Sequence, residues 1–569
     1  MVHNVTSATR LLDVVPLFHD DFRVQLLATC TGSSAFRAGI TELLADLAVP
    51  VVPWEQVGHV PVALAISASL GGQLAAIDGQ LTVLSHGIGY TKRLATPDTR
   101  HPTPDTRHPT PDTRHPTPDT RHPTPEGRGV GGGADPVFGM SPEWLLTEGG
   151  VPVADTLVLS HPEQYERLRT ACPEAAPTAV LAGDPCWDRI LAARPHRDRF
   201  RRALGVRRGQ RLLLLSSTWN PDSLFGDTGD DRLPALLPEL AAEFPADEYR
   251  LAAVLHPNVW HGHGPGQIRA WLDRARRSGL TLVDPLHGWR QALLAADAVL
   301  GDHGSVTYYA AALGTPVLLG AAPLSGLDPR APVHDFVRRA PRLDPGRPLR
   351  AQLDGLVEAH RPDPRPAAFT SSLPGESAAH LRRVFYDRIG LPEPVGPALL
   401  EPLPLPGYEP PAYTVPQLVR TRPTGPCEIE VTRYTGRPTA PARDDHEAHT
   451  AVHEDTRDPG ELALADVVFR QADPADPRFG TPAEWTAEIL ARYPHCALAV
   501  HIGGPGTCTV RTRSDTLLDL RVHGDADPLT GACALHAWLS AGKGLDEVLA
   551  QGLTVRTGPV THRVELTLR

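Results

Sequence analysis

The chain has 569 residues, of which 41% are hydrophobic and 21% charged, proportions typical of a globular protein with two to four domains. Its formal net charge of −11 argues against a nucleic-acid-binding protein, which needs a basic surface. Its seven cysteines are scattered without a C-x-x-C pair, which indicates reduced thiols and argues against a disulfide framework or a zinc ribbon.

The N-terminal residues lack the basic start and long apolar core of a signal peptide. No apolar stretch in the sequence reaches the length of a membrane-spanning helix. We therefore expect a soluble, cytoplasmic protein. Peripheral contact with the inner face of a membrane is left open.

Residues 1–195 alternate short apolar runs with helix-like segments, the pattern of a Rossmann-like domain with a parallel sheet. The strands expected here are residues 22–28, 60–67, 81–85, 156–160 and 179–182. One helix is expected over residues 35–47 and another opens at His161. The strand at residues 81–85 ends directly before His86, which places a titratable side chain at the carboxyl edge of the sheet.

Residues 96–133 hold the heptapeptide TPDTRHP, repeated from Thr96 to about Thr124, and then a glycine-rich run that ends at Gly133. Each repeat carries two prolines and no aliphatic residue, so it cannot form a coiled coil or bury a core. We expect an extended or disordered insert in the first domain, and favour an expanded surface loop over a ligand-binding repeat.

A second α/β series occupies residues 196–390, after a basic helix around residues 195–205. Its expected strands are residues 211–216, 251–255, 281–283, 298–300 and 316–319. Two series in tandem predict two Rossmann-like domains that face one another. Polar residues follow several strands, among them His256 and Asp302.

The stretch GDHGSVTYYAAALGTPVLLG, residues 301–320, reads as strand, turn, helix and strand. Small residues at the turn leave backbone N–H groups open at the start of a helix over residues 307–313, which stops at Gly314. A helix start of this kind favours phosphate, although an ordinary βαβ unit with a good cap explains the same residues.

A proline-rich linker at residues 391–425 precedes a separate α+β domain at residues 426–569. Strands are expected there at residues 427–432, 497–502, 516–522 and 563–568, and helices at 482–493 and 529–539. Residues 503–506 (GGPG) indicate a hairpin turn, because no lysine, hydroxyl residue and helix follow as in a phosphate loop. The sequence assigns this domain no task.

Five stretches occur in the order found in the CDP-glycerol glycerophosphotransferases: SHGIGYTK (85–92), GDPCWDRI (183–190), LLLLSSTWNPDSLFG (212–226), VLHPN (254–258) and ADAVLGDHGSVTYYAAALGTPVLL (296–319). Residues 20–390 thus resemble that family, whose members build teichoic-acid-type polymers. The resemblance implies a GT-B fold of two facing Rossmann-like domains. It also implies transfer of a glycerophosphate or glycosyl group from a nucleotide-activated donor to a polymeric, lipid-linked or small hydroxyl acceptor.

The resemblance also implies roles for single residues. His86 matches the general base that deprotonates the acceptor hydroxyl, and imidazole suits this work because its pKa lies near neutral pH. The alternative is a histidine that only caps a strand turn. His256 matches a contact to the donor diphosphate that assists departure of the nucleotide phosphate, and Lys92 falls where the family often places a basic residue.

Asp302, Ser305 and Val306 match the family's Asp-x-Ser-Ser motif, whose hydroxyls and helix start hold the same diphosphate. Here Gly304 replaces the first serine, so backbone N–H groups must carry more of the binding, with Thr307 as a replacement hydroxyl. The departure leaves the donor open between CDP-glycerol and a nucleotide sugar.

We predict no obligatory cofactor and no metal. His256, His261 and His263 cluster within LHPNVWHGHGPG, but no acidic neighbour accompanies them, so a flexible histidine-containing loop is favoured over a zinc site. Trp219 and Trp289 are candidates for stacking on a nucleobase, with core packing as the default for each. Two alternatives to a transferase remain: a non-catalytic GT-B-like nucleotide-binding or scaffold protein, and a nucleotide-sugar 2-epimerase.

Overall fold

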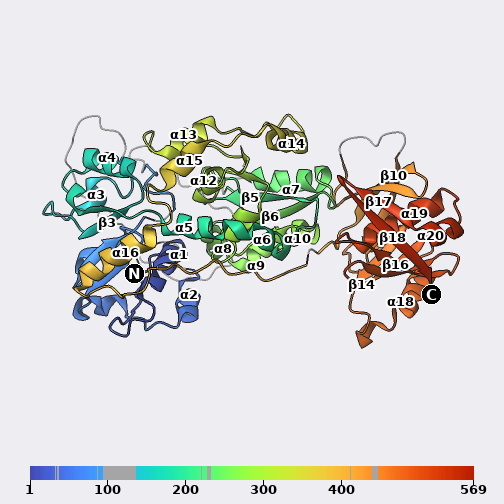
Figure 1. Ribbon diagram of the computed structural model, residues 1–569, viewed down its shortest axis with the longest axis horizontal. Helices are drawn as coiled ribbons and strands as arrows, with labels where there is room; N and C mark the ends of the chain where they lie inside the picture. Colours follow the sequence, from blue (N-terminus) through green and yellow to red (C-terminus); the bar gives the residue numbers. More distant parts are fainter. Residues whose placement is uncertain are drawn as a thin grey trace, which may run out of the picture.

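The computed structural model describes residues 1–32, 34, 38–85, 87–93, 136–219, 221–226, 232–410, 412–438 and 446–569. Three units lie in a row along the long axis of the molecule, with the C-terminal unit at the end opposite the first sheet (Figure 1). His86 and the whole TPDTRHP insert fall outside the described residues.

The first unit contains a four-stranded parallel sheet in the order β1-β2-β3-β4, as far as the structure describes this part of the chain. Its strands are β1 (Leu64–Ser67), β2 (Gln80–Val83), β3 (Thr156–Leu159) and β4 (Ala179–Leu181). Its helices are α1 (Val5–Val14), α2 (Ile40–Leu47), α3 (Pro142–Leu145), α4 (Pro162–Ala171) and α5 (Pro185–Ala193). The strand expected at residues 22–28 is wrong: only Ala28 makes a bridge there, to Val51, and Phe22 is fully exposed.

The second unit contains a five-stranded parallel sheet in the order β7-β6-β5-β8-β9, within the residues described. Its strands are β5 (Arg211–Ser217), β6 (Tyr249–Leu255), β7 (Thr281–Leu282), β8 (Ala298–Gly301) and β9 (Val317–Leu319). Its helices are α6 (Arg197–Ala203), α7 (Arg232–Glu243), α8 (Pro257–His263), α9 (Pro265–Trp271), α10 (Asp273–Arg277), α11 (Trp289–Ala295), α12 (Ser305–Ala312), α13 (Pro332–Arg339), α14 (Leu349–Ala359) and α15 (Pro364–Thr370). Because both faces of a parallel sheet are covered, its strands read as continuous apolar runs, and β5 is buried along nearly its whole length.

The chain then returns to the first unit. Helix α16 (Ser377–Ile389) packs against β1 and β2, although it follows the second sheet in sequence. Asp188 of α5 fixes the start of α16 by accepting hydrogen bonds from the N–H groups of Gly375, at 2.6 Å, and Ser377, at 2.9 Å. The first unit is therefore completed by residues from the far end of the second.

The third unit is a barrel of nine strands, counted over the residues described, closed by the pairing of β10 with β12. Its strands are β10 (Gln417–Gly425), β11 (Glu428–Tyr434), β12 (Glu447–His453), β13 (Val467–Gln471), β14 (Leu498–Gly504), β15 (Thr507–Thr512), β16 (Leu517–Val522), β17 (Leu553–Thr557) and β18 (Val560–Leu568). Its helices are α17 (Pro459–Ala463), α18 (Pro482–Arg492), α19 (Pro528–Ser540) and α20 (Leu545–Gln551). The GGPG stretch joins β14 and β15 in an antiparallel hairpin, as predicted.

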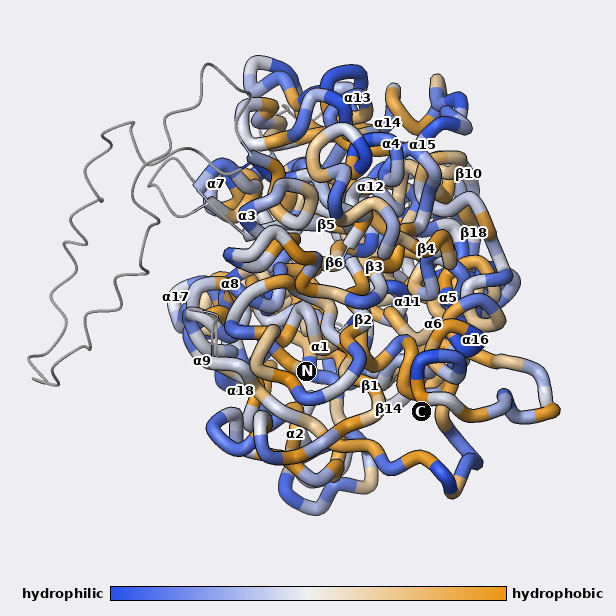
Figure 2. The backbone as a smooth tube through the Cα atoms, turned by 90° about the vertical axis from the view of Figure 1, so that its left-hand side faces the viewer, coloured by the Kyte–Doolittle hydropathy of each residue, from blue (hydrophilic) through white to orange (hydrophobic). Residues whose placement is uncertain are grey.

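Helix α19 runs through this barrel. It packs against strands all around the ring, and every residue from Pro528 to Trp538 is buried. A helix that is apolar on all sides must be buried on all sides, and the barrel provides that environment. Figure 2 shows the hydrophilic stretches mainly at the rim of the molecule, around the strands at its centre.

The proline-rich segment between α16 and β10 is held to the two α/β units as it runs to the barrel (Figure 1). Arg189 of α5 donates to the carbonyl of Glu401 at 2.7 Å, and Gln291 of α11 donates to the carbonyl of Pro404 at 2.9 Å. The barrel itself docks on the second unit through Arg433, which pairs with Asp247 at 2.6 Å. The expected linker is thus attached at several points along its length.

Two facing Rossmann-like domains followed by an additional α+β domain are confirmed. All seven cysteines are free. Among the helices of the described residues, none combines the length and the apolar character needed to cross a bilayer.

Candidate functional site

The carboxyl ends of three parallel strands in the second sheet bring polar residues to one edge. Strand β5 leads into Thr218 and Trp219, β6 into His256, and β8 into Asp302 and Gly304. This edge is where open α/β sheets bind ligands. It lies next to the first unit, because Lys92 pairs with Leu327 in an isolated bridge between the two units.

Asp302 shapes this edge from beneath. Its side chain is fully buried, and Oδ2 accepts hydrogen bonds from the N–H groups of Thr218, at 2.8 Å, and Leu224, at 3.0 Å. Oδ1 accepts from the Gly304 N–H at 2.9 Å. Asp302 therefore joins the loop after β5 to the turn after β8, and orders the site without facing a ligand.

Gly304 is the N-cap of α12 and is packed closely against the β5 loop. A Cβ at this position would lie 2.9 Å from Cβ of Thr218 and 3.0 Å from Oδ1 of Asp302. The serine of the family motif would meet the same two groups. The crowding gives a physical reason for glycine here.

Among the described residues, the first turn of α12 has three backbone donors without acceptors, two on half-buried residues and the third on the fully buried Thr307. No side chain caps the helix at Gly304, and the N–H groups of Ser305, Val306 and Thr307 have no acceptor within the described part of the chain. Ser305 and Val306 are half-buried. Thr307 is different: it is fully buried, and its Oγ1 lies against Gly301, beneath the helix start.

His256 is the N-cap of the next helix along this edge, α8. Its Nδ1 accepts a hydrogen bond from the Asn258 N–H at 3.1 Å. In the neutral imidazole the proton therefore sits on Nε2, which makes Nε2 the donor nitrogen. The ring lies beside Trp219, with 6.3 Å between the ring centroids.

Two basic side chains, those of Lys92 and His303, lie on the same edge. The Nζ of Lys92 lies 4.7 Å from the centroid of the Trp219 ring. Lys92 is exposed, yet the protein crowded around its ammonium group lowers its pKa by desolvation, which the charge of Asp302 partly offsets. His303 is buried with an unpartnered Nδ1, and burial lowers its pKa, with a further contribution from Lys92.

The two units touch where Gly87, in the stretch SHGIGYTK, lies against the start of α12. Gly87, with φ of +76°, lies so close to Ser305 that a Cβ on the glycine would be 2.4 Å from the serine Oγ. His86 itself lies outside the described residues, so only its neighbour is placed. That neighbour sits at the start of α12.

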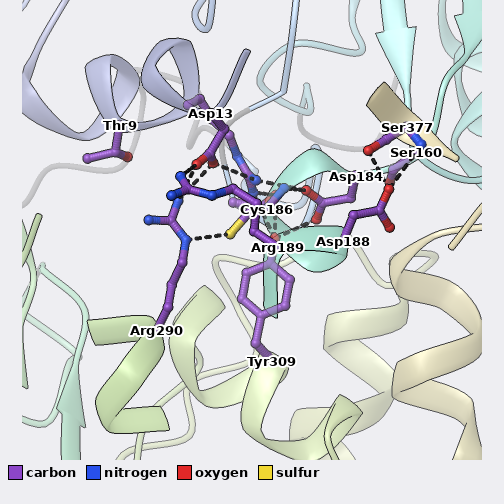
Figure 3. A network of polar contacts seen from close by, with 12 residues as sticks. Thr9, Asp13, Ser160, Asp184, Cys186, Asp188, Arg189, Arg290, Tyr309 and Ser377 are labelled. Carbon is purple, nitrogen blue, oxygen red and sulfur yellow. Dashed lines mark hydrogen bonds and ion pairs between the residues drawn. The ribbon is translucent and has the colours of Figure 1, made fainter. Parts of the chain in front are cut away.

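A buried ionic network joins the two units (Figure 3) and contacts Gly87 through Arg10. Arg10 of α1 pairs with Asp184 at 2.8 Å and donates to the Gly87 carbonyl at 2.7 Å. Tyr309 of α12 accepts from Arg10 at 2.7 Å and donates to Asp184 at 2.6 Å. Arg10 of the first unit and Tyr309 of the second thus join Gly87 to helix α12.

A second arm of the network lies beside the first, as Figure 3 also shows. Asp13 of α1 accepts from Arg290 of α11 at 2.8 Å and also pairs with Arg189. Burial lowers the pKa of the Arg290 guanidinium, but the negative charge of Asp13 outweighs that effect and raises it overall. The guanidinium groups of Arg10 and Arg290 therefore stay protonated.

Sequence reasoning missed Arg10, Tyr309 and His303. The available signal was weak: Arg10 and Asp13 stand three positions apart, on the buried face of a helix whose other buried members are mostly apolar. Charged residues on such a face indicate a buried partner. Nothing in the sequence names that partner.

The three clustered histidines do not form a flexible loop. His256 caps helix α8, and His261 and His263 lie within it. His261 faces Gly39 of the first unit, and the His263 ring contacts Trp271. Within the described residues no group of three or more histidine, cysteine or acidic side chains is arranged to hold a metal ion.

Comparison with known proteins finds similarity only among solved structures. No family model matches the chain, and no curated protein sequence matches it. A structure of the wall teichoic acid polymerase TagF is 13% identical and covers 68% of this chain and 86% of its own, with a TM-score of 0.42.

Two other solved structures have lower scores. A glycosyltransferase from Rickettsia africae is 7% identical over 67% of this chain and 93% of its own, with a TM-score of 0.34. Anabaena HepE in complex with UDP-glucose is 11% identical over 68% of this chain and 95% of its own, with a TM-score of 0.31. A teichoic acid polymerase is thus among the structures to which this chain is similar, as its motifs led us to expect.

Proposed function

We propose that the chain is a transferase that moves a glycerophosphate or glycosyl group from a nucleotide-activated donor to a hydroxyl acceptor. The observation that carries the proposal is the start of α12, where three N–H groups without acceptors lie beside Gly87, the neighbour of His86. Open N–H groups at a helix start favour a diphosphate through direct hydrogen bonds and through the helix dipole.

The side chains around this corner suit an anion. Lys92 supplies positive charge from the first unit, and His256 in its neutral form supplies an Nε2 donor from the second. Ser305 adds a hydroxyl at the helix start itself. Backbone N–H groups and a single hydroxyl take the place of the two serines of the family motif, because Gly304 has no room for a side chain.

In the proposed step the acceptor hydroxyl gives its proton to His86 and its oxygen attacks the donor. For a CDP-glycerol donor the new bond forms at the β-phosphorus, and for a nucleotide sugar at the anomeric carbon. The bond to the departing nucleotide phosphate breaks, and the charge that develops on that phosphate is stabilised by His256, Ser305 and the N–H groups of α12. The proposal requires no cofactor and gives no role to a metal.

Substitutions of His86 and His256 distinguish a role as general base from a role in donor binding. His86→Ala is expected to abolish transfer and leave donor affinity unchanged. His256→Ala is expected to weaken donor binding by about 10- to 100-fold, the effect of losing one hydrogen bond to a charged group. Both are measured by calorimetric titration with CDP-glycerol, UDP-sugars and GDP-sugars, and by product formation from each donor.

His161→Ala is the matched control for His256→Ala. His161 caps α4 in the same way, its Nδ1 accepting from the Glu163 N–H at 3.1 Å. Both variants lose an equivalent cap, so only the difference in donor affinity reports a phosphate contact. Full transfer activity in His86→Ala would contradict the proposal. Binding without turnover of any donor by the unaltered chain would favour a non-catalytic nucleotide-binding protein.

A further inference from the structure

The guanidinium of Arg10 is shared between the two sides of the proposed site. Arg10 is 5% exposed and lies on α1, outside the sequence motifs that supplied the expected site residues. Nη1 pairs with Asp184 at 2.8 Å. Nη2 donates both to the Gly87 carbonyl and to the Tyr309 hydroxyl, each at 2.7 Å.

These partners sit next to the groups that the reaction needs. Gly87 follows His86 directly, so the carbonyl that Arg10 holds belongs to the residue next to the proposed base. Tyr309 is on α12, one turn beyond Ser305, and its ring stacks on Trp187 with 6.0 Å between centroids. One planar side chain therefore fixes the spacing between the acceptor-side loop and the donor-side helix.

The chemistry of this contact requires arginine. A guanidinium presents several N–H donors in a rigid fork, whereas a lysine ammonium is a single point of charge on a flexible stem. Burial disfavours the charged form of Arg10, but Asp184 and its other neighbours outweigh this and raise its pKa overall, so the fork stays fully protonated. A lysine could keep the ion pair with Asp184 but could not also span Gly87 and Tyr309.

The second arm of the network, the Asp13–Arg290 pair, only joins the two units. Asp13 and Arg290 join α1 to α11 by an ion pair of 2.8 Å, and Figure 3 shows this pair beside Tyr309 and Asp184. No hydrogen bond or ion pair from Arg290 reaches Gly87, within the residues described. The hydrogen bond from Arg10 to the Gly87 carbonyl is thus not required to hold the two units together.

We infer that Arg10 is a positioning residue for the transfer reaction: it holds Gly87, the residue that follows His86, against the start of α12. This inference rests on the proposed function. Arg10 acts through the Gly87 carbonyl and through Tyr309, and touches neither donor nor acceptor itself.

The test compares Arg10→Lys with the unaltered chain in turnover and in hydrogen–deuterium exchange. The kcat for transfer is expected to fall by about 10- to 100-fold, because small displacements of a reacting group have effects of this size. Donor KM is expected to change by less than about threefold, because the N–H groups of α12 are untouched. Amide exchange in residues 87–93 is expected to quicken, with exchange in β5 and β6 unchanged.

Arg433→Lys is the control. Arg433 is also a buried arginine between two carboxylates, Asp247 and Asp527, but it lies at the barrel junction. It is expected to lower thermal stability without changing kcat or exchange in residues 87–93. If Arg10→Lys does not fold, Tyr309→Phe decides, since it removes one hydroxyl and keeps the ring stack; it is expected to show smaller changes in the same directions.

The two hypotheses fail in different ways. If the unaltered chain transfers nothing from any donor, the proposed function fails, while the exchange data still report whether Arg10 holds the Gly87 segment. If transfer occurs but Arg10→Lys changes neither kcat nor exchange, the positioning role is overturned and the proposed function stands. A fall in kcat equal to that of Arg433→Lys would also overturn it.

Discussion

Gly87 has a conformation and a contact that both require glycine. Its φ of +76° is in the left-handed region, and a Cβ would lie 2.4 Å from Oγ of Ser305. Gly150 has nearly the same φ, +75°, but a Cβ there would meet nothing within 4 Å. The pair separates backbone strain from the contact between the two units.

Alanine at each position tests that contact. Gly150→Ala should lower the free energy of unfolding by about 1 kcal/mol, from left-handed strain alone. Gly87→Ala should lower it by about 1–3 kcal/mol more, because Ser305 must move, and should weaken donor binding as well. Urea unfolding and calorimetric titration measure the two effects. Equal losses of stability with unchanged donor affinity would contradict the placement of Gly87 against α12.

At the scale of single elements, the barrel holds two buried histidines that face one another. His449 of β12 and His536 of α19 lie with their ring centroids 4.2 Å apart, and Nε2 of His449 and Nδ1 of His536 are buried without partners. Burial lowers the pKa of both, that of His449 to about 3, with His536 itself contributing to the shift at His449. Asp466 and Glu447 oppose the shift at His536 without reversing it.

The barrel should therefore lose stability in mild acid. Below pH 6.5 the unfolded chain binds protons that the folded histidines exclude, so the free energy of unfolding falls as the pH falls from 6.5 toward 3. Each such histidine contributes a slope of up to about 1.4 kcal/mol per pH unit. His449→Phe should flatten this slope in urea unfolding measured between pH 6.5 and 4.

His495→Gln is the control for that experiment, because His495 is exposed on the barrel surface. It should leave the acid slope almost unchanged. An acid slope for His449→Phe equal to that of the unaltered chain would show that the pair does not limit barrel stability.

At the scale of the whole molecule, the barrel is docked on the second unit by a buried charge cluster. Arg433 is 1% exposed and bonds Asp247 of the second unit and Asp527, the N-cap of α19. Burial raises the pKa of Asp527, but Arg433 and Arg207 outweigh it and hold that pKa well below its usual range. The cluster thus joins the α19 start to the neighbouring domain.

Arg433→Met should uncouple the barrel from the rest of the chain. It leaves two buried carboxylates without their shared partner, which costs about 3–5 kcal/mol. Differential scanning calorimetry should then resolve a lower-temperature transition for the barrel. The double variant with Asp247→Asn should recover part of the loss. A single transition at the original temperature would contradict the coupling.

Local chemistry made many of the elements predictable. Apolar runs bounded by glycine and proline predicted β1 to β9 closely, and the helix at residues 307–313 corresponds to α12, with Gly314 just past its end at φ of +80°. Where local signals were ambiguous the predictions missed: residues 22–28 look like a strand, but find almost no strand to pair with. Strands β10, β12, β13, β15 and β17 were not predicted, because their places depend on pairing within the barrel.

The residues of the candidate site were likewise predictable only in part. The sequence alone determined which residues end the parallel strands, because turns and helix caps depend on near neighbours, and it therefore named His256, Asp302 and Ser305. Only the tertiary structure decided that Arg10 meets Tyr309, 299 positions away, and that Thr307 points beneath the helix. Which buried charges meet depends on how whole domains pack, and no local pattern records that geometry.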